Sequence, residues 1–272
     1  MTETIASSSI VTPSPWAATG ALAWRELVRF LRQRNRVIGA LATPIVFWLL
    51  LGLGVGDSFQ APGSDASYLV YFFPGMILMV VLFTAIFSTI TLIEDRREGF
   101  MQGVLVAPVP RWSIVLGKVL GSTLLASGQG VLLLAIGPIV GLGFDVVGYA
   151  IAAVFIVLTS FGLSSLGVLL AWPMTSTQGF HVIMNLLLMP MWFMSGAIFP
   201  ITAAKVSLIR WLVLANPATY GLAGIRHGLT PGELPGVPNV WICLLVTAVA
   251  GAVAFGFASF VATRPARADA AA

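Results

Sequence analysis

The residue types that usually carry enzyme chemistry are few in this chain and stand apart from one another. Its 272 residues include one cysteine, Cys243, and two histidines, His181 and His227. A single cysteine excludes an internal disulfide and a cysteine-based zinc site, and we expect it to pack inertly in its apolar run. The isolated histidines are expected to be packed or interfacial side chains. With no acidic cluster in the sequence, we predict no metal site.

Nucleotide-binding motifs are also missing from the sequence. The dipeptide Gly117-Lys118 has Trp112 where a phosphate-binding loop needs its first glycine, and Val119 where it needs Ser or Thr. Neither HExxH nor GxSxG occurs. We therefore predict a protein that is not an enzyme and that binds no cofactor itself. If it performs active transport, the energy must come from another polypeptide.

The composition is that of an integral membrane protein. Hydrophobic residues make up 58% of the chain and charged residues 9%, and the mean hydropathy is +0.98. Soluble domains carry roughly 25% charged residues, so a soluble globule could not bury this much apolar surface. The net charge of +4 comes from basic residues at segment ends, where anionic lipid headgroups attract them. This placement favours membrane lipid and argues against nucleic acid.

Gaps between charged residues predict an all-α fold with six transmembrane helices, since a helix needs about 20 apolar residues to cross. The predicted spans cover about 37–56, 68–93, 118–142, 146–171, 179–199 and 239–262. They belong to one transmembrane domain, 21–263, between a disordered leader, 1–20, and a short tail, 264–272. Small-residue pairs such as Gly117/Gly121 are expected to permit close helix contacts.

The distribution of basic residues predicts the orientation. Eleven lie before span one, after span two or in the tail, and three lie in the connection 200–237. The positive-inside rule then places both termini in the cytoplasm. The multi-pass chain is expected in a bacterial inner membrane.

Residues 22–36 predict an amphipathic helix on the cytoplasmic membrane surface. Its apolar face comprises Trp24, Leu27, Val28 and Leu31. Its basic face, expected at the lipid phosphates, comprises Arg25, Arg29, Arg32 and Arg36. The alternative is a polar extension of span one.

The insert EDRREGFMQGVLVAPVPRWSIVLGK, residues 94–118, predicts a short helix ended by Pro108 and Pro110. Such a helix, fixed between two spans by a stiff corner, would act as a lever, and its apolar side chains suit docking into a partner's groove. The alternative is a solvated positive loop.

Residues 199–238 are too apolar for a solvated loop and predict a re-entrant hairpin on the outer side, interrupted at Asn216-Pro217. The alternative is two short helices resting on the outer headgroups. Inside the spans, Thr123, Gln129 and Asn185 either line a passage or hydrogen-bond between helices.

Two motifs carry a resemblance to a known family. Glu98-Gly99, Leu105-(x)2-Pro108-(x)2-Arg111 and Gly117-Lys118 together resemble the signature loop of ABC-2 type transporter permeases, the membrane subunits of type V ATP-binding-cassette exporters. SGAIFP (195–200) and NPATYGLAGIR (216–226) resemble that family's outer hairpin. The resemblance runs from about Trp24 to Val261, and the loop looks most similar to drug- and antibiotic-export permeases of the daunorubicin-resistance type. Phe100-Met101 departs from the usual Thr-Leu.

The resemblance implies a homodimer, or a pair with a homologous permease, beneath which separate ATP-binding-cassette ATPase subunits hold ATP and Mg. The docking residues would be Glu94, Arg96, Arg97, Glu98, Gly99, Leu105, Pro108 and Arg111. The interface helix would contribute Trp24, Arg25, Arg29 and Arg32. The outer hairpin would contribute Pro200, Asn216, Pro217, Tyr220 and Arg226.

The implied function is ATP-driven export of an amphipathic or lipid-like substrate, in the first place a drug or antibiotic. Export of a polysaccharide or glycolipid is the alternative within the family. An ion-coupled carrier or channel, and a membrane scaffold or receptor, are the alternatives outside it.

Overall fold

The computed structural model describes residues 14–55, 67–198, 207–230 and 236–264. Within these ranges the regular structure is helical, without strands. The longer helices are α1 (Pro15–Arg32), α2 (Arg34–Val55), α3 (Tyr68–Phe87), α6 (Arg111–Leu134), α8 (Val146–Ala171), α9 (Thr177–Phe193), α11 (Pro217–Leu229) and α12 (Val240–Thr263). The shorter ones are η2 (Ser88–Ile90), α4 (Thr91–Arg97), α5 (Phe100–Val106), α7 (Gly137–Val140) and α10 (Ser207–Ala215).

Five of the described helical segments are long and apolar enough to cross a membrane: Val37–Gly54, Tyr68–Arg97, Arg111–Leu134, Val146–Ala171 and Val240–Thr263. These correspond to five of the six predicted spans. The span predicted at 179–199 corresponds to α9, which has only 17 residues and ends at Phe193. At 1.5 Å per residue, α9 is about 26 Å long, shorter than the roughly 30 Å hydrocarbon layer. The chain turns directly after it, where Ser195 follows in a hydrogen-bonded turn with Trp192.

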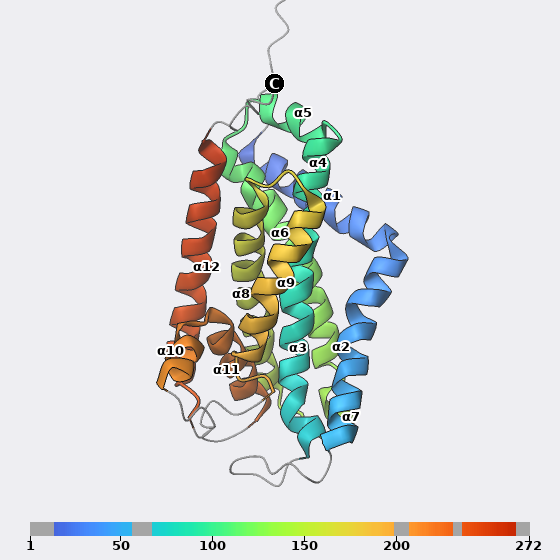
Figure 1. Cartoon of the computed structure of the whole chain (residues 1–272), viewed down its shortest axis with the longest axis vertical. Coiled ribbons are helices and arrows are strands. Elements are labelled where there is room, and N and C mark those ends of the chain that lie inside the picture. Colours follow the sequence, from blue (N-terminus) through green and yellow to red (C-terminus); the bar gives the residue numbers. More distant parts are fainter. Residues whose placement is uncertain (1–13, 56–66, 199–206, 231–235, 265–272) are drawn as a thin grey trace, which may run out of the picture.

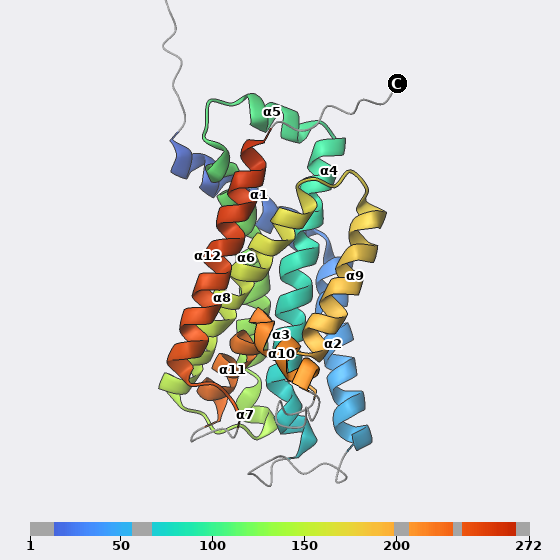
Figure 2. The same cartoon turned by 60° about the vertical axis from the view of Figure 1, so that its left-hand side comes forward.

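The continuous helix formed by α3, η2 and α4 lies at the centre of the bundle, and 89% of its most apolar 18-residue stretch is buried. Helices α2, α6, α8 and α9 pack around α3, and α12 packs on α8 (Figures 1 and 2). A side chain at Gly75 would collide with Ala197, its Cβ lying 2.8 Å from the Ala197 carbonyl oxygen. The indole of Trp192 donates to the Gly75 carbonyl at 2.9 Å. The turn after α9 is therefore held tightly against α3.

One end of the bundle carries α1, α4, α5 and the carboxyl end of α12, whereas α7, α10 and α11 lie at the other (Figures 1 and 2). The segments predicted to share the cytoplasmic side therefore share one end of the described structure. The side of the membrane stays a prediction.

Helix α1 lies across the bundle axis and differs in two ways from the predicted interface helix (Figure 1). It begins at Pro15, inside the stretch 1–20 predicted as a disordered leader, and it ends at Arg32. Helix α2 then begins at Arg34, so the predicted segment 22–36 is divided between two helices. Proline suits the first turn of a helix because its missing N–H has no partner there in any case.

The described part of the connection between α9 and α12 contains two helices, α10 and α11, as both readings of the sequence predict. Helix α11 packs against α8, α12 and α3. Gly228 and Gly148 bring the backbones of α11 and α8 so close that an added Cβ at Gly148 would overlap the Gly228 carbonyl. The side chain of Asn216 accepts a hydrogen bond from the Ala218 N–H at 3.0 Å and so begins α11. Helix α11 is therefore part of the packed bundle, and the re-entrant hairpin stays a prediction.

Candidate functional site

Six charged side chains form an ion network where α1 crosses the end of the bundle: Arg25, Glu26, Arg29, Glu94, Asp95 and Lys118. Asp95 is its centre and is 0% exposed. Arg25 binds both of its carboxylate oxygens through two guanidinium nitrogens, at 2.8 and 2.9 Å. Arg29 donates to Oδ1 at 2.8 Å, and Lys118 donates to Oδ2. One carboxylate therefore joins α1, α4 and α6.

Glu26 is the second buried carboxylate of the ion network, only 4% exposed. Its Oε1 accepts from Lys118 Nζ at 2.6 Å and from Arg25 at 3.2 Å. Its Oε2 accepts from the Thr91 hydroxyl at 2.7 Å. Lys118, itself 2% exposed, thus lies between two carboxylates that come from different helices.

The six members of the ion network are three cations and three anions, and at its exposed edge a fourth carboxylate, that of Glu98, lies 3.6 Å from Arg29. Arg29 also reaches Glu94 at 2.9 Å at the more exposed edge. The hydrogen bond from Arg25 to Asp95 raises the pKa of Arg25 above its ordinary value, although burial alone would lower it. Buried ion pairs gain little net stability over apolar packing, but removing one partner is costly. The ion network therefore fixes one arrangement of α1, α4 and α6.

Two glycines of α6 allow α1 to approach closely enough for these contacts. An added Cβ at Gly117 would lie 2.8 Å from Leu22 Cβ, and one at Gly121 would lie 2.6 Å from Glu26 Cβ. The predicted close contact at Gly117/Gly121 is confirmed, and its partner is α1. Because Lys118 follows Gly117 directly, the close approach places its side chain beside Glu26.

A corner between α4 and α5 covers the ion network. Gly99 forms the corner at φ 80°, a left-handed conformation that favours glycine. Met101 is buried against the bundle, and the Arg25 guanidinium lies 3.7 Å from the centre of the Phe100 ring. Val106, at 85% exposed, has no such cover. A displacement of α5 would therefore act directly on Arg25 and on the ion network.

The single short helix predicted from the insert is two elements in the structure. Glu94, Arg96 and Arg97 belong to α4, the end of the long central helix, and α5 begins only at Phe100. The break follows from Gly99, whose conformation ends α4 and turns the chain.

The eight predicted docking residues divide by exposure. Arg97, Glu98 and Pro108 are exposed, whereas Gly99, Leu105 and Arg111 are half-buried. Glu94 turns inward to Arg29. Arg96 donates to the Met174 carbonyl at 3.2 Å and so connects α4 to the turn between α8 and α9.

Two of the four arginines predicted on the basic face of the interface helix do not point away from the protein. Arg25 and Arg29 turn toward Asp95, because buried carboxylates attract them more strongly than solvated phosphates would. Trp24 and Arg32 are exposed. Arg25 and Arg29 are therefore internal ion-pair partners, and placing them at the lipid phosphates was wrong.

The predicted hairpin residues hold the far end of the bundle together, apart from Pro200, which lies outside the described residues. Asn216 donates to the Met191 carbonyl at 2.6 Å, and Pro217 occupies the first turn of α11. The Tyr220 hydroxyl donates to the Leu214 carbonyl at 2.9 Å. The buried Arg226 donates to the Gly196 carbonyl at 2.8 Å, and its guanidinium lies 4.5 Å from the centre of the Tyr71 ring.

The three candidate path residues lie in different surroundings. Thr123 is buried and donates to the Val119 carbonyl, and Gln129 is buried and accepts from Thr84 at 2.6 Å. Asn185 is on the exposed face of α9. A hollow of about 350 Å³ lies nearby, bounded by α2, α3 and α9. Its lining includes Thr43, Phe83, Thr84, Phe87, Ser88 and His181.

Sequence reasoning missed four members of this site: Glu26, Thr91, Asp95 and Lys118. Glu26 did carry a signal, because it shares four-residue spacing with Leu22 and Phe30. These three form the buried face of α1, whereas Trp24 and Leu31 of the predicted apolar face are exposed. A carboxylate on a buried face requires a partner. Within the described ranges, no group of three or more His, Cys, Asp or Glu side chains could hold a metal ion.

Fold and site together define a multi-pass helical membrane protein with the ion network at one end of its helix bundle. The chain belongs to the ABC-2 type transporter family, whose model matches residues 17–230. It is thus a transport permease by class rather than an enzyme.

The names of similar proteins agree with this family assignment. Inner membrane transport permease YadH of Escherichia coli K12 is 26% identical over 219 residues, covering 78% of this chain and 83% of the relative. Nodulation protein J of Rhizobium meliloti is also 26% identical over 219 residues, covering 73% and 80%. Transport permease ycf38 of Cyanophora paradoxa is 25% identical over 205 residues, covering 74% and 70%.

Proposed function

We propose that this chain is the membrane-spanning subunit of an ATP-driven exporter, powered by a separate ATP-binding-cassette ATPase that holds ATP and Mg. The ion network carries the proposal. It connects the exposed α4–α5 corner to α1 and α6 through buried charges. A subunit that is driven by a partner's force at one end of its bundle requires such a connection. The relatives named as transport permeases support the transport role.

The exposed part of the α4–α5 corner is the proposed docking surface for the ATPase. Arg97, Glu98, Val106 and Pro108 are exposed there. A push on this surface would move Phe100 and Arg25 together, and through Asp95 it would move α6. Through Arg96 it would also move the turn between α8 and α9. Force entering at one corner would thus reach three parts of the bundle.

The cargo proposed for the exporter is an amphipathic or lipid-like molecule, a drug or antibiotic in the first place. The hollow between α2, α3 and α9 supports this class, because aromatic rings and a few hydroxyls line it. A glycolipid would present similar surfaces and is the alternative.

Pairing of two copies in a bacterial inner membrane belongs to the same proposal. Asn185 is a polar side chain on an exposed helix face with apolar neighbours such as Val182 and Leu186. Polar side chains in lipid stabilise contacts between helices. A second copy covering this face of α9 would shield Asn185 from the hydrocarbon.

The test uses the tagged full-length chain, purified from its native host in mild detergent. We expect an ATP-binding-cassette ATPase to copurify, and Val106→Asp to abolish the association because it places a charge on the docking surface. Val106→Thr is the matched control, with nearly the same shape and no charge, and should retain the partner.

Reconstitution in liposomes separates the proposal from its alternatives. The pair of subunits should transport cargo only with ATP and Mg. Uphill transport by the lone chain along an ion gradient would establish an ion-coupled carrier and overturn the proposal. Equal ATPase recovery with Val106→Asp would overturn the assigned docking surface.

A further inference from the structure

The side chain of Phe30 lies between two internal spaces. It lines the hollow of about 350 Å³ beside α2 and α9, and in the described lining of that hollow it is the residue that α1 supplies. It also lines a much smaller gap, of about 10 Å³, whose other walls are Glu26, Arg29, Gln33, Ser88, Thr91 and Leu125. Ser88 is the second residue that lines both spaces. Phe30 and Ser88 therefore form the partition between the hollow and the ion network.

Phe30 is the member of this partition that can move with α1. Ser88 belongs to the central helix, and its hydroxyl donates to the Ala85 carbonyl at 3.0 Å within that helix. Phe30 lies in the last turn of α1, where its carbonyl accepts a hydrogen bond from the Gln33 N–H at 2.9 Å. The residue is only 7% exposed. A shift of α1 therefore moves one wall of the hollow.

The ion network fixes the position of this last turn. Glu26 lies one turn before Phe30 on the same face of α1, and its carboxylate is held by Lys118 at 2.6 Å. Arg29 directly precedes Phe30 and donates to Asp95 at 2.8 Å. Because packed helices shift as units, a change in either ion pair should pass to the ring of Phe30.

Aromatic rings also form much of the wall beyond Phe30. The ring centres of Phe83 and Phe87 are 5.7 Å apart, and the Phe87 ring lies 5.2 Å from that of His181 on α9. Protein interiors are close-packed, so a ring in such a wall cannot move without changing the space beside it. Displacement of Phe30 toward the hollow would narrow it, and displacement away would widen it.

We propose that Phe30 is a positioning residue that couples the ion network to the hollow. A movement of α1 that begins at the α4–α5 corner would carry the ring against the hollow. A molecule in the hollow would in turn resist that movement, because coupling between two sites is reciprocal. The use of this coupling in transport rests on the proposed function, whereas the coupling itself is a property of this chain alone.

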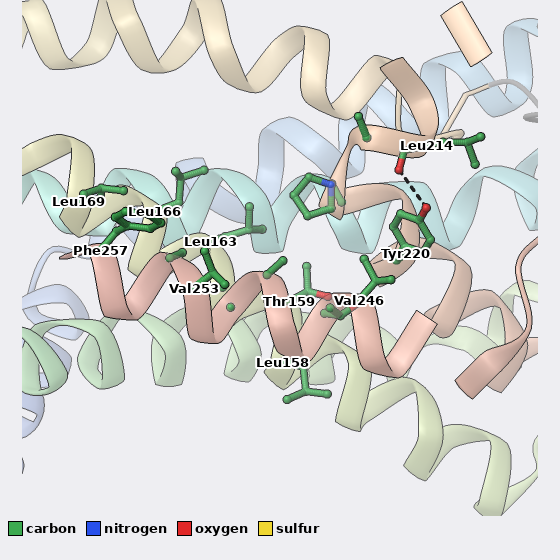
Figure 3. A pocket seen from close by; sticks show the side chains of 18 residues that line it. Leu158, Thr159, Leu163, Leu166, Leu169, Leu214, Tyr220, Val246, Val253 and Phe257 are labelled. Atoms are coloured by element: carbon green, nitrogen blue, oxygen red, sulfur yellow. Dashed lines mark hydrogen bonds between the residues drawn. The ribbon is translucent and has the colours of Figure 1, made fainter. Parts of the chain in front are cut away.

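A larger hollow, of about 430 Å³, provides a reference site because it lies on other helices. Figure 3 shows it on the seam between α8 and α12, with Leu163, Leu166, Val253 and Phe257 along it. None of its described lining residues belongs to α1 or to the ion network. Its surroundings should therefore not respond when the ion network changes.

The test uses the full-length chain in nanodiscs with one fluorine label. Cys243 is replaced by alanine, and Thr43→Cys, in the hollow beside α2, carries a trifluoromethyl group whose surroundings are followed by fluorine NMR. We expect Lys118→Met to change the ratio of the fluorine signals about fivefold, within the range of coupling between neighbouring side chains. The same label at Ala250→Cys, in the seam of Figure 3, should not respond. Arg97→Met, which removes an exposed cation, should leave the signals of the hollow unchanged.

A matched pair of variants assigns the coupling to Phe30. Phe30→Leu shortens the side chain and should reduce the response to Lys118→Met to less than about twofold. Phe83→Leu makes the same change in a ring that lines the hollow but not the small gap, and it should leave the response intact. Glu26→Gln is a milder change of the ion network and should shift the signals in the same direction. All variants are compared below their melting temperatures.

Two sets of results would overturn the proposal. The first is a spectrum unchanged by both Lys118→Met and Glu26→Gln, or a full response that survives Phe30→Leu. The second is an equal loss of response in Phe83→Leu, or an equal response at Ala250, since either would show general loosening of the bundle. Failure of the proposed function is recognised separately, by ATPase copurification and ATP-dependent transport, neither of which enters this measurement.

Discussion

Replacing Lys118 by methionine tests whether the ion network holds α1 on the bundle. The change keeps most of the side-chain volume and removes a cation that is 2% exposed. Glu26 would lose its 2.6 Å partner and retain Thr91 and a longer contact to the half-exposed Arg25. Asp95 would still be bound by both arginines. The uncompensated charge would therefore fall mainly on Glu26.

The expected cost follows from this count of remaining partners. Removing one member of a buried ion pair costs about 3–5 kcal/mol, and because Arg25 remains we expect about 3 kcal/mol. In proteins of this size, each kcal/mol lowers the melting temperature by roughly 2–4 °C, so the loss should be roughly 6–12 °C. Thermal unfolding of the purified full-length chain in detergent, followed by tryptophan fluorescence, measures this loss.

A double-mutant cycle gives the prediction its specificity. Glu26→Gln should be the milder single change, because Lys118 keeps Asp95 as its partner. Adding Glu26→Gln to Lys118→Met should recover part of the lost stability, since the lone buried carboxylate is gone. Arg97→Met removes an exposed cation from the same end of the chain and should cost at most about 0.5 kcal/mol. The ion network does not hold α1 if Lys118→Met has the same melting temperature as the Arg97→Met control. The same follows if adding Glu26→Gln to Lys118→Met lowers the melting temperature further.

Three further substitutions test the contacts at both ends. Gly121→Ala should cost about 1–3 kcal/mol in thermal unfolding, because its Cβ would meet Glu26, whereas Gly128→Ala in the same helix has open space and should gain about 0.5–1 kcal/mol. Asn216→Ala removes a helix cap and the hydrogen bond to Met191 and should cost about 2–3 kcal/mol. The control Asn239→Ala removes only an exposed helix cap and should cost about 1 kcal/mol. Arg226→Met leaves the buried Gly196 carbonyl without its donor and should lower stability by about 1–3 kcal/mol; an unchanged melting temperature would contradict this role.

The long apolar helices could be predicted from the sequence because their cause is local. A run of about 20 apolar residues between charges is enough to indicate a span, and five of the described helices meet that condition. The limits of the helices were less predictable where tertiary contacts set them. Helix α9 ends at Phe193 although apolar residues continue to Ile198, because the turn that follows packs against Gly75.

The ion network could not be predicted, because its members are distant in sequence. Lys118 binds Asp95 across 23 positions and Glu26 across 92. At span ends, charged residues ordinarily indicate headgroup anchors, and apart from the spacing of Glu26 with Leu22 and Phe30 nothing local distinguishes an anchor from a buried partner. Only the position of α1 on Gly117 and Gly121 decides which charges face inward, and that position depends on the whole helix contact.

The ion network also bears on the predicted orientation. Three of the eleven basic residues counted toward the cytoplasmic side, Arg25, Arg29 and Lys118, are neutralised by carboxylates in the folded chain. The positive-inside rule is not a rule of net charge, and Asp and Glu contribute little to it. Pairing after folding therefore does not cancel the bias that these residues exert on the inserting chain. The same cations can first bias the orientation of this end and then fix α1 to α4 and α6. In the predicted orientation, the proposed ATPase-docking corner lies on the cytoplasmic side, where ATP is found.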